Sequence, residues 1–248
     1  AASSSIDENS DSTITLTATL SVATFQDVTV SIDGTGGTGS EGTDFGTVSD
    51  ITISAGSTTG TVNFTPTDDS VYEGNETATI AISSVSGGDA SENGDQSVTV
   101  TITENESAPT VTLSVSATSI AENAGTSITV TATLSGATDE AVTVALSTSG
   151  TATEGTDYTD GSGNVDDITI SAGATTGTVN FTPTDDSIYE GNETATLAIS
   201  SVSGGSATES GSQSKTITIT DNESAPTVTL SASSDTILEN STSFTLTA

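Results

Sequence analysis

The chain has 248 residues, and its 34 acidic side chains stand against a single basic one, Lys215, which gives a formal net charge of −33. Nucleic acid and membrane insertion are not expected for this segment, because binding to phosphate groups needs Lys and Arg and a spanning helix needs a long apolar run. Cys, His, Met and Trp are absent, which excludes zinc sites, thiol nucleophiles and histidine acid–base chemistry. Hard divalent cations such as Ca²⁺, which take oxygen ligands, are the expected counter-charge.

Polar and apolar residues alternate through the first hundred positions, and this pattern predicts half-buried β-strands. In chain order the expected strands are residues 13–20, 28–32, 51–54, 61–65, 77–83 and 97–103. Turn-forming residues separate them at 34–39, 55–56, 66–74 and 87–94. With the strand expected in an APTVTL segment, a complete unit has about seven strands, which fits an immunoglobulin-like β-sandwich.

A long internal repeat divides the chain. Residues 58–88 recur as residues 175–205 with two conservative changes, and the APTVTL segment at 108–113 recurs at 225–230. Both ends of the sequence fall inside repeats, so we expect an array that continues in both directions. The predicted units are 1–107, with its first strand truncated, 108–224, which is complete, and 225–248, which opens a third.

Strand order predicts where the acidic loops lie, because consecutive antiparallel strands reverse direction. The loops after the second and fourth strands, the residues after the last strand and those before the first all fall at one pole. In the first unit this pole carries Glu8, Asp44, Asp68, Asp69, Glu73, Glu76, Glu104 and Glu106. In the second it carries Glu122, Asp157, Asp185, Asp186, Glu190, Glu193, Asp221 and Glu223. Carboxylates ~4 Å apart repel by about 4 kcal/mol per pair at an effective dielectric near 20, so such clusters protonate or hold metal.

Three tracts resemble the Calx-beta domain: EGTDF at 41–45, DDSVYEGNE at 68–76 and ITENE at 102–106. That domain is a seven-stranded sandwich found in the calcium sensor of sodium–calcium exchangers and in many large extracellular proteins. The resemblance covers both units and the start of the third, and it implies that the carboxylates named above are Ca²⁺ ligands. The chain departs from the most acidic members at Asn105 and Asn222, where an Asp would add charge, which implies fewer ions or weaker binding.

The acidic pole is expected to lie at the joint between units. The last strand of the first unit ends there, and only residues 107–109 precede the first strand of the next, so the units should stack head to tail. Asp139 and Glu140 fall on the facing side, but two adjacent acids in a strand connection are ordinary, and we expect a solvated surface. Aromatic side chains near the acidic loops are expected to fill the core beneath them: Phe45, Tyr72, Tyr158 and Tyr189.

The sequence therefore predicts tandem, seven-stranded immunoglobulin-like β-sandwiches of Calx-beta type. Their expected role is a stalk of a bacterial surface adhesin or extracellular fibre, located at the cell surface or secreted, and rigidified by Ca²⁺ at the joints. Catalysis is not expected, because paired carboxylates of a glycosidase need a sugar cleft, usually lined by aromatic residues, and the chain is 3% aromatic. Expected partners are calcium ions, neighbouring repeats, and other copies in a fibre or cell-surface ligands. Two alternatives remain: adhesion by the repeats themselves, or a filament assembled by strand exchange, with residues 225–248 supplying a strand.

Overall fold

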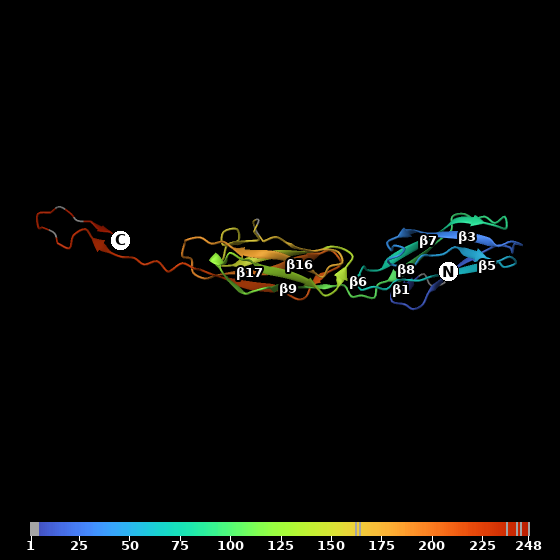
Figure 1. The fold of residues 1–248 in the computed structure, drawn as a ribbon, viewed down its shortest axis with the longest axis horizontal. Coiled ribbons are helices and arrows are strands. Elements are labelled where there is room, and N and C mark those ends of the chain that lie inside the picture. Colours follow the sequence, from blue (N-terminus) through green and yellow to red (C-terminus); the bar gives the residue numbers. More distant parts are fainter. Residues whose placement is uncertain are drawn as a thin grey trace.

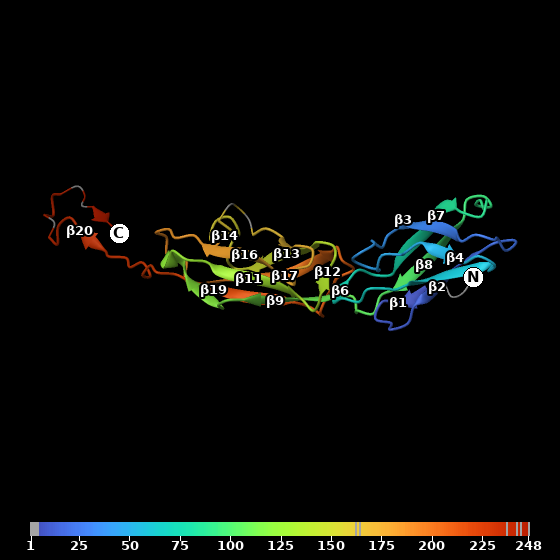
Figure 2. The same cartoon turned by 45° about the vertical axis from the view of Figure 1, so that its right-hand side comes forward.

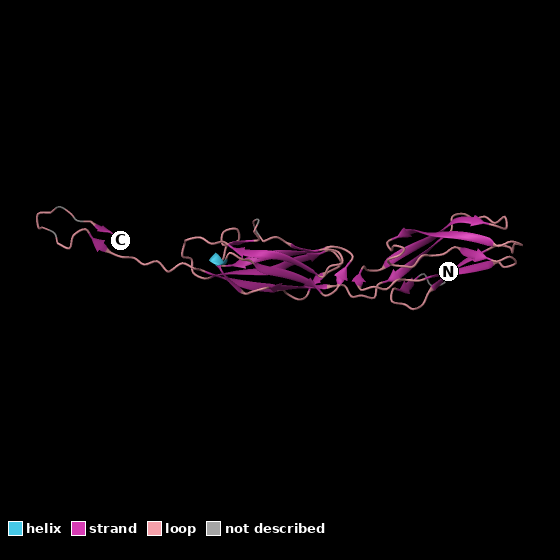
Figure 3. Ribbon diagram, viewed as in Figure 1, coloured by secondary structure: helices cyan, strands magenta, loops and turns pink. Residues whose placement is uncertain are grey.

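Two β-sandwiches lie end to end, and a small hairpin lies beyond the second (Figure 1). The structure, a computed structural model, describes residues 5–161, 163, 165–236, 238–241, 243 and 245–247. Strands and loops make up these residues, with one short 3₁₀ helix, η1 (Glu122–Ala124) (Figure 3). The predicted all-β, tandem immunoglobulin-like architecture is confirmed.

The first sandwich has one large and one small sheet. The large sheet has the order β1 (Ser5–Asp7), β8 (Ser97–Thr103), β7 (Glu76–Ser86), β3 (Val28–Gly37), β4 (Ile51–Ile53). The small sheet pairs β2 (Ile14–Thr19) with β5 (Thr59–Phe64). Between the sheets lies a core of alternate residues from these strands, in which the rings of Phe45 and Phe64 are 5.0 Å apart.

The second sandwich has two five-stranded sheets. One has the order β10 (Ser119–Ala121), β19 (Ser214–Thr220), β17 (Glu193–Ser203), β13 (Val142–Gly150), β15 (Ile168–Ile170). The other has the order β14 (Tyr158–Thr159), β16 (Thr176–Pro183), β11 (Ile128–Leu134), β9 (Thr110–Val115), β18 (Thr208–Glu209). Tyr158 stacks on Phe181 at 4.6 Å in its core, so the expected core positions of Phe45 and Tyr158 are confirmed.

The glycine-rich stretch 34–39 was predicted as a turn, and this prediction is wrong for its first part. Strand β3 continues through it to Gly37 and pairs with β7, with irregularities at two places in the register. Gly37 has a φ of +111°, and a Cβ at this position would lie 1.9 Å from the carbonyl oxygen of Thr77. Glycine is thus required because the backbone of β7 comes so close, which the residue type alone does not reveal.

A short pair of strands joins the two sandwiches. β6 (Val71–Tyr72) of the first pairs in parallel with β12 (Ala137–Thr138) of the second, and the Asp139 amide donates to the Tyr72 carbonyl at 3.4 Å (Figure 2). Tyr72 lines a groove of about 300 Å³ at this joint. The expectation that Tyr72 and Tyr189 fill the cores is therefore wrong: Tyr72 packs at the joint, and Tyr189 is 46% exposed.

Residues 225–247 contain only a two-stranded hairpin, β20 (Ser231–Ala232) with β21 (Leu246–Thr247), in the part of them that the structure describes. Their apolar side chains are exposed and belong to neither core. Among the described residues, no helix has the length and apolar character needed to cross a bilayer.

Candidate metal centre

A parallel strand pair brings the first acidic residues together. β1 runs parallel to β8 with Asp7 opposite Thr103, and the Glu8 amide donates to the Thr103 carbonyl at 3.0 Å. Both strands therefore end at the same pole, with Glu8 and Glu104 side by side. One carboxylate oxygen from each of Glu8, Glu104 and Glu106 lies within 4.8 Å of the other two.

A second group forms where β3 and β7 meet. The chain leaving β3 turns into the loop that carries Asp44, while β7 starts at Glu76 and the loop before it carries Glu73. Oxygens of Asp44, Glu73 and Glu76 also lie within 4.8 Å of one another. We call these two sets the Glu8 group and the Asp44 group.

The second sandwich repeats both sets. Parallel pairing of β10 with β19 places Glu122 beside Asp221 and Glu223, the Glu122 group. Asp157, Glu190 and Glu193 form the Asp157 group, with the same limit of 4.8 Å between ligand oxygens.

The tandem aspartates fall outside these four groups. Asp68 accepts a hydrogen bond from the Asn105 side chain at 3.0 Å, as Asp185 does from Asn222 at 3.1 Å. Asp69 and Asp186 cap their own turns through the amides two residues further on. The predicted ligand role of these four aspartates remains a prediction, as it does for the residues in the groups. Asn105 and Asn222 thus orient one aspartate of each pair.

Comparison with known proteins identifies the fold family. The Calx-beta domain profile matches residues 2–106 and 104–223. The chain belongs to the Calx-beta domain family. No curated protein matches it.

Solved structures show more distant likenesses. The crystal structure of CBD12 from CALX1.2 is 18% identical with a TM-score of 0.37, over 88% of this chain and 95% of that chain. The apo form of the Calx CBD1 domain is 20% identical with a TM-score of 0.38, over 46% of this chain and 98% of that one. The adhesin InvE of Yersinia pseudotuberculosis is 16% identical with a TM-score of 0.34, over 90% of this chain and 57% of that chain. With TM-scores below 0.5, these likenesses add nothing to the family assignment.

Hydrogen bonds from the backbone organise each acidic pole of the Calx-beta domains. One oxygen of Glu104 accepts the amides of Glu73 and Gly74 at 2.6 and 2.8 Å, and the other accepts the amide of Glu106 at 3.0 Å. Burial of Glu104 raises its pKa, but these hydrogen bonds outweigh it and hold the pKa below the usual value. Asp221 accepts the equivalent amides in the second domain, and its pKa is also lowered. Glu104 thereby ties the Glu8 group to the loop of the Asp44 group.

Three glutamates of the first domain, Glu8, Glu73 and Glu76, hold protons unusually tightly. Burial, followed by the charges of Glu104 and Glu106, raises the pKa of Glu8 to about 7 despite a hydrogen bond from the Asp69 amide. Burial and then the charge of Asp44 raise the pKa values of Glu73 and Glu76 to about 7 as well.

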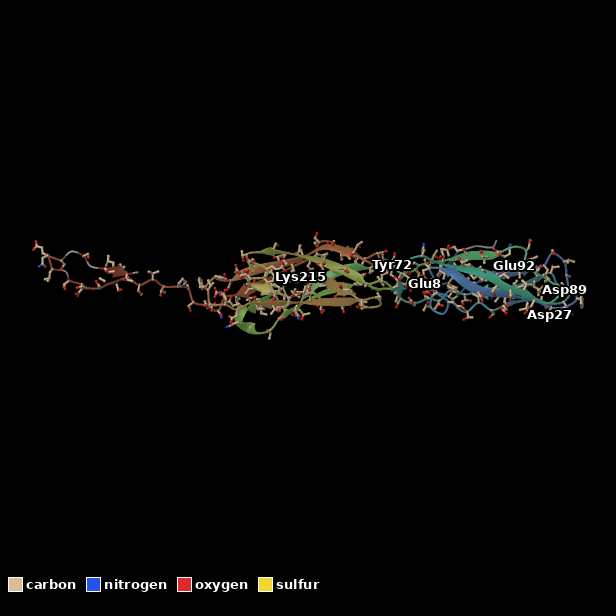
Figure 4. The ribbon with its side chains drawn as sticks, turned by 90° about the horizontal axis from the view of Figure 1, so that it is seen from above. Glu8, Asp27, Tyr72, Asp89, Glu92 and Lys215 are labelled. Atoms are coloured by element: carbon tan, nitrogen blue, oxygen red, sulfur yellow. The ribbon has the colours of Figure 1, made fainter. Side chains whose placement is uncertain are left out.

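In the second domain, a hydrogen bond with Glu122, followed by burial, raises the pKa of Glu223 to about 7. The pKa values of Glu190 and Glu193 are also raised, by burial first and then by the charge of Asp157. The only basic side chain, Lys215, lies on the body of this domain and away from the joint (Figure 4). Within the described residues, therefore, no basic side chain lies at the joint.

Two buried carboxylate oxygens indicate whether a cation fits these groups. Oε2 of Glu106 and Oε2 of Glu223 are buried and accept no hydrogen bond from the described residues. A buried carboxylate oxygen without a partner is costly, and a bound cation removes that cost. The donors are all carboxylates in close, irregular sets, which is the chemistry that Ca²⁺ accepts. The residues present therefore fit a calcium ion in the Glu8 and Glu122 groups.

Asp139 lies on the facing side of the joint, as the sequence predicted. It follows β12 directly, and its charge raises the pKa values of both Glu73 and Glu76 across the joint. The pKa of Asp139 is raised by partial burial, and then by the charges of Glu140 and Asp44. Asp139 is exposed, as expected for a solvated connection, but it lies close enough to the Asp44 group for its charge to act on Glu73 and Glu76. Glu140 instead caps a loop of its own domain, accepting the Gly205 amide at 3.1 Å.

Proposed function

We propose that these tandem Calx-beta domains bind Ca²⁺ at their acidic poles and form a rigid spacer within an extracellular stalk, such as that of a bacterial surface adhesin or fibre. The proposed repeat units are residues 1–107 and 108–224, followed by the start of a third at 225–248. Calcium-binding extracellular modules work at about 10⁻⁴–10⁻³ M Ca²⁺, a range that suits a site built from several flexible carboxylates.

The observation that carries this proposal is the close approach of carboxylates in the acidic groups, together with buried carboxylate oxygens that have no hydrogen-bond donor. Four sets of three carboxylates have ligand oxygens within 4.8 Å, with two buried oxygens that no donor in the described chain satisfies. A bound cation relieves both the repulsion between the carboxylates and the cost of their desolvation.

The joint gives the ion a structural role. Asp139 belongs to the second domain but faces the Asp44 group of the first, so without an ion the two domains repel one another there. An ion in the Asp44 group offsets two of its three negative charges, which weakens this repulsion and favours the contact between β6 and β12. Calcium would thus limit bending at the joint.

Calorimetric titration with Ca²⁺ tests the binding itself. In the double variant Glu104→Gln, Glu106→Gln, we expect the first domain to lose at least tenfold in affinity while the second keeps its own. Glu92→Gln is the matched control, because Glu92 lies toward the opposite end of the first domain from Glu8 (Figure 4). Equal titrations for both variants and the unchanged chain would contradict the proposal.

A further inference from the structure

The segments by which the chain enters and leaves the second domain run side by side in the same direction. The chain enters this domain at the joint, passes through β9 and β10, and leaves at the opposite end through β19 (Figure 1). β10 pairs in parallel with β19, with Ser119 opposite Thr218 and Ala121 opposite Thr220. The first domain repeats this arrangement in the parallel pairing of β1 with β8.

The segment from β9 to β10 also ties the two sheets of the second domain together. β9 lies in one sheet, antiparallel to β11, whereas β10 lies in the other. Val111 and Leu113 of β9 are buried in the core between the sheets. The Gln213 side chain, just before β19, accepts the Leu113 amide at 3.3 Å and donates to the Ser210 carbonyl at 2.6 Å. A pull on β9 is therefore passed to both sheets.

Hydrogen bonds cross directly between the parallel segments. The Thr218 amide donates to the Thr118 carbonyl at 2.9 Å, and the Thr220 hydroxyl donates to the Ile120 carbonyl at 3.4 Å. In the first domain, the Thr103 hydroxyl donates to a carbonyl of β1 in the same way, at 3.2 Å. Both the backbone and the side chains therefore join the two load-carrying segments.

The direction of a pull decides how these bonds break. When the chain is stretched along its length, β10 is drawn toward the joint and β19 toward the far end, parallel to both strands. The hydrogen bonds run across the strands, so a load in this direction shears them together. A load that opens the pair from one end breaks them one after another. Shear therefore gives the higher barrier to unfolding, and forced unfolding is governed by the rate at which that barrier is crossed.

We propose that the parallel pairing of β10 with β19 is a force-bearing clamp, which lets the domain carry tension along the chain without unfolding. The pairing of β1 with β8 gives the first domain the same clamp. This function goes beyond that of a rigid spacer, because stiffness at the joint does not by itself keep a domain folded under load. The clamp consists of strand pairing and needs no ion.

The Glu122 group lies at the end of this clamp. Glu122 follows β10 directly, Asp221 and Glu223 follow β19, and their ligand oxygens lie within 4.8 Å of one another. The Asn222 amide also donates to Glu122 at 3.4 Å. An ion in this group would join the two strands beyond their last paired residues. This strengthening rests on the proposed calcium binding and is therefore tested separately from the clamp.

Single-molecule pulling of the full chain in two directions tests the clamp. The chain has no cysteine of its own, so a pair of introduced cysteines defines where the force is applied. Ala108→Cys with Ala225→Cys, both at exposed positions, loads the second domain along its length. Ala124→Cys with Ala225→Cys places both handles at the end that carries the Glu122 group and peels β10 from β19. Both variants should unfold thermally like the unchanged chain before the handles are attached.

In EDTA, the force that unfolds the second domain along its length should be at least about twice the force in the peeling direction. Complete unfolding along the length should release about 400 Å of chain, at ~3.6 Å per residue. Equilibrium stability does not depend on where the handles are attached, so this difference can come only from the direction of the load. Equal forces in the two directions would overturn the proposal.

A second comparison separates the ion from the clamp. Millimolar Ca²⁺ should raise the lengthwise unfolding force of the second domain, and the double variant Glu122→Gln, Glu223→Gln should lose this increase. A direction-dependent force in EDTA with no effect of Ca²⁺ would support the clamp and contradict calcium binding at the Glu122 group. An effect of Ca²⁺ with equal forces in the two directions would support calcium binding and overturn the clamp.

Discussion

Replacing Glu8 by Gln isolates the electrostatic cost of an acidic pole that holds no ion. Glu8 is 6% exposed, and its pKa is raised from 4.5 to about 7. The folded state binds its proton more tightly than the unfolded state, so stability is lost as pH rises from about 4.5 to about 7 and is not regained above. At ~1.4 kcal/mol per pKa unit the shift corresponds to about 3 kcal/mol. Relaxation and counter-ions reduce this, so we expect Glu8→Gln to stabilise the first domain by about 1–2 kcal/mol at pH 8 in EDTA.

Unfolding curves at pH 5 and pH 8, in EDTA and in millimolar Ca²⁺, measure this effect. Gln keeps the oxygen that accepts the Asp69 amide, so the substitution removes the charge and little else. At pH 5 the difference should nearly disappear, because Glu8 is then protonated in the folded state. In Ca²⁺ the sign should reverse, because Gln lacks the charge that binds the ion. The second domain, which the substitution does not touch, is the internal reference. An equal effect at both pH values, or destabilisation at pH 8 in EDTA, would refute the reasoning.

Three further changes test the packing, the backbone and the joint. Phe181→Ala removes a fully buried ring and should lower the free energy of unfolding in urea by about 3–5 kcal/mol. Phe25→Ala changes an exposed ring and should alter this free energy by less than about 0.5 kcal/mol. Similar losses in the two variants would contradict the assigned core. Gly150→Ala should destabilise the second domain by more than about 2 kcal/mol, because Gly150 has a φ of +132° and a Cβ there would lie 2.1 Å from the Thr194 carbonyl oxygen. An unchanged melting temperature in this variant would contradict this backbone conformation. Asp139→Asn should lower the pKa values of Glu73 and Glu76 in an NMR titration without Ca²⁺ and leave those of Glu190 and Glu193 unchanged. Unchanged pKa values for all four glutamates would contradict the assigned role of Asp139 at the joint.

Much of the fold follows from the sequence, because a period-two pattern and a near-exact repeat leave few alternatives. Strand 97–103 was predicted with its observed bounds, and the acidic loops gather at the predicted pole. Chain reversal between antiparallel strands was enough to place Asp44 near Glu76. The position of β1 could not be predicted in this way, because a three-residue strand gives no periodic signal. Its parallel pairing with β8 is nonetheless what brings Glu8 to Glu104.

The joint shows why local sequence was insufficient. DDSVYEGNE and DDSIYEGNE differ by one methylene group, yet Val71 and Tyr72 form β6 and are half-buried, while Ile188 and Tyr189 form no strand and are exposed. The neighbouring domain makes this difference, and no pattern within either loop encodes it. For the same reason the sequence placed Asp139 on the facing side as an exposed acid but did not predict its effect on Glu73 and Glu76. Its importance comes from the residues that face it across the joint.

Small-angle scattering and thermal unfolding of the same sample, in EDTA and in millimolar Ca²⁺, test the central claim most directly. Measurement at a concentration where the chain is monomeric separates bending at the joint from assembly. If calcium holds the domains together, Ca²⁺ should raise the melting temperature by 10 °C or more, at roughly 4–8 °C per kcal/mol for a domain of this size, and give a longer, stiffer particle. The same melting temperature and the same scattering in both solutions would contradict the account and leave an acidic spacer that works without an ion.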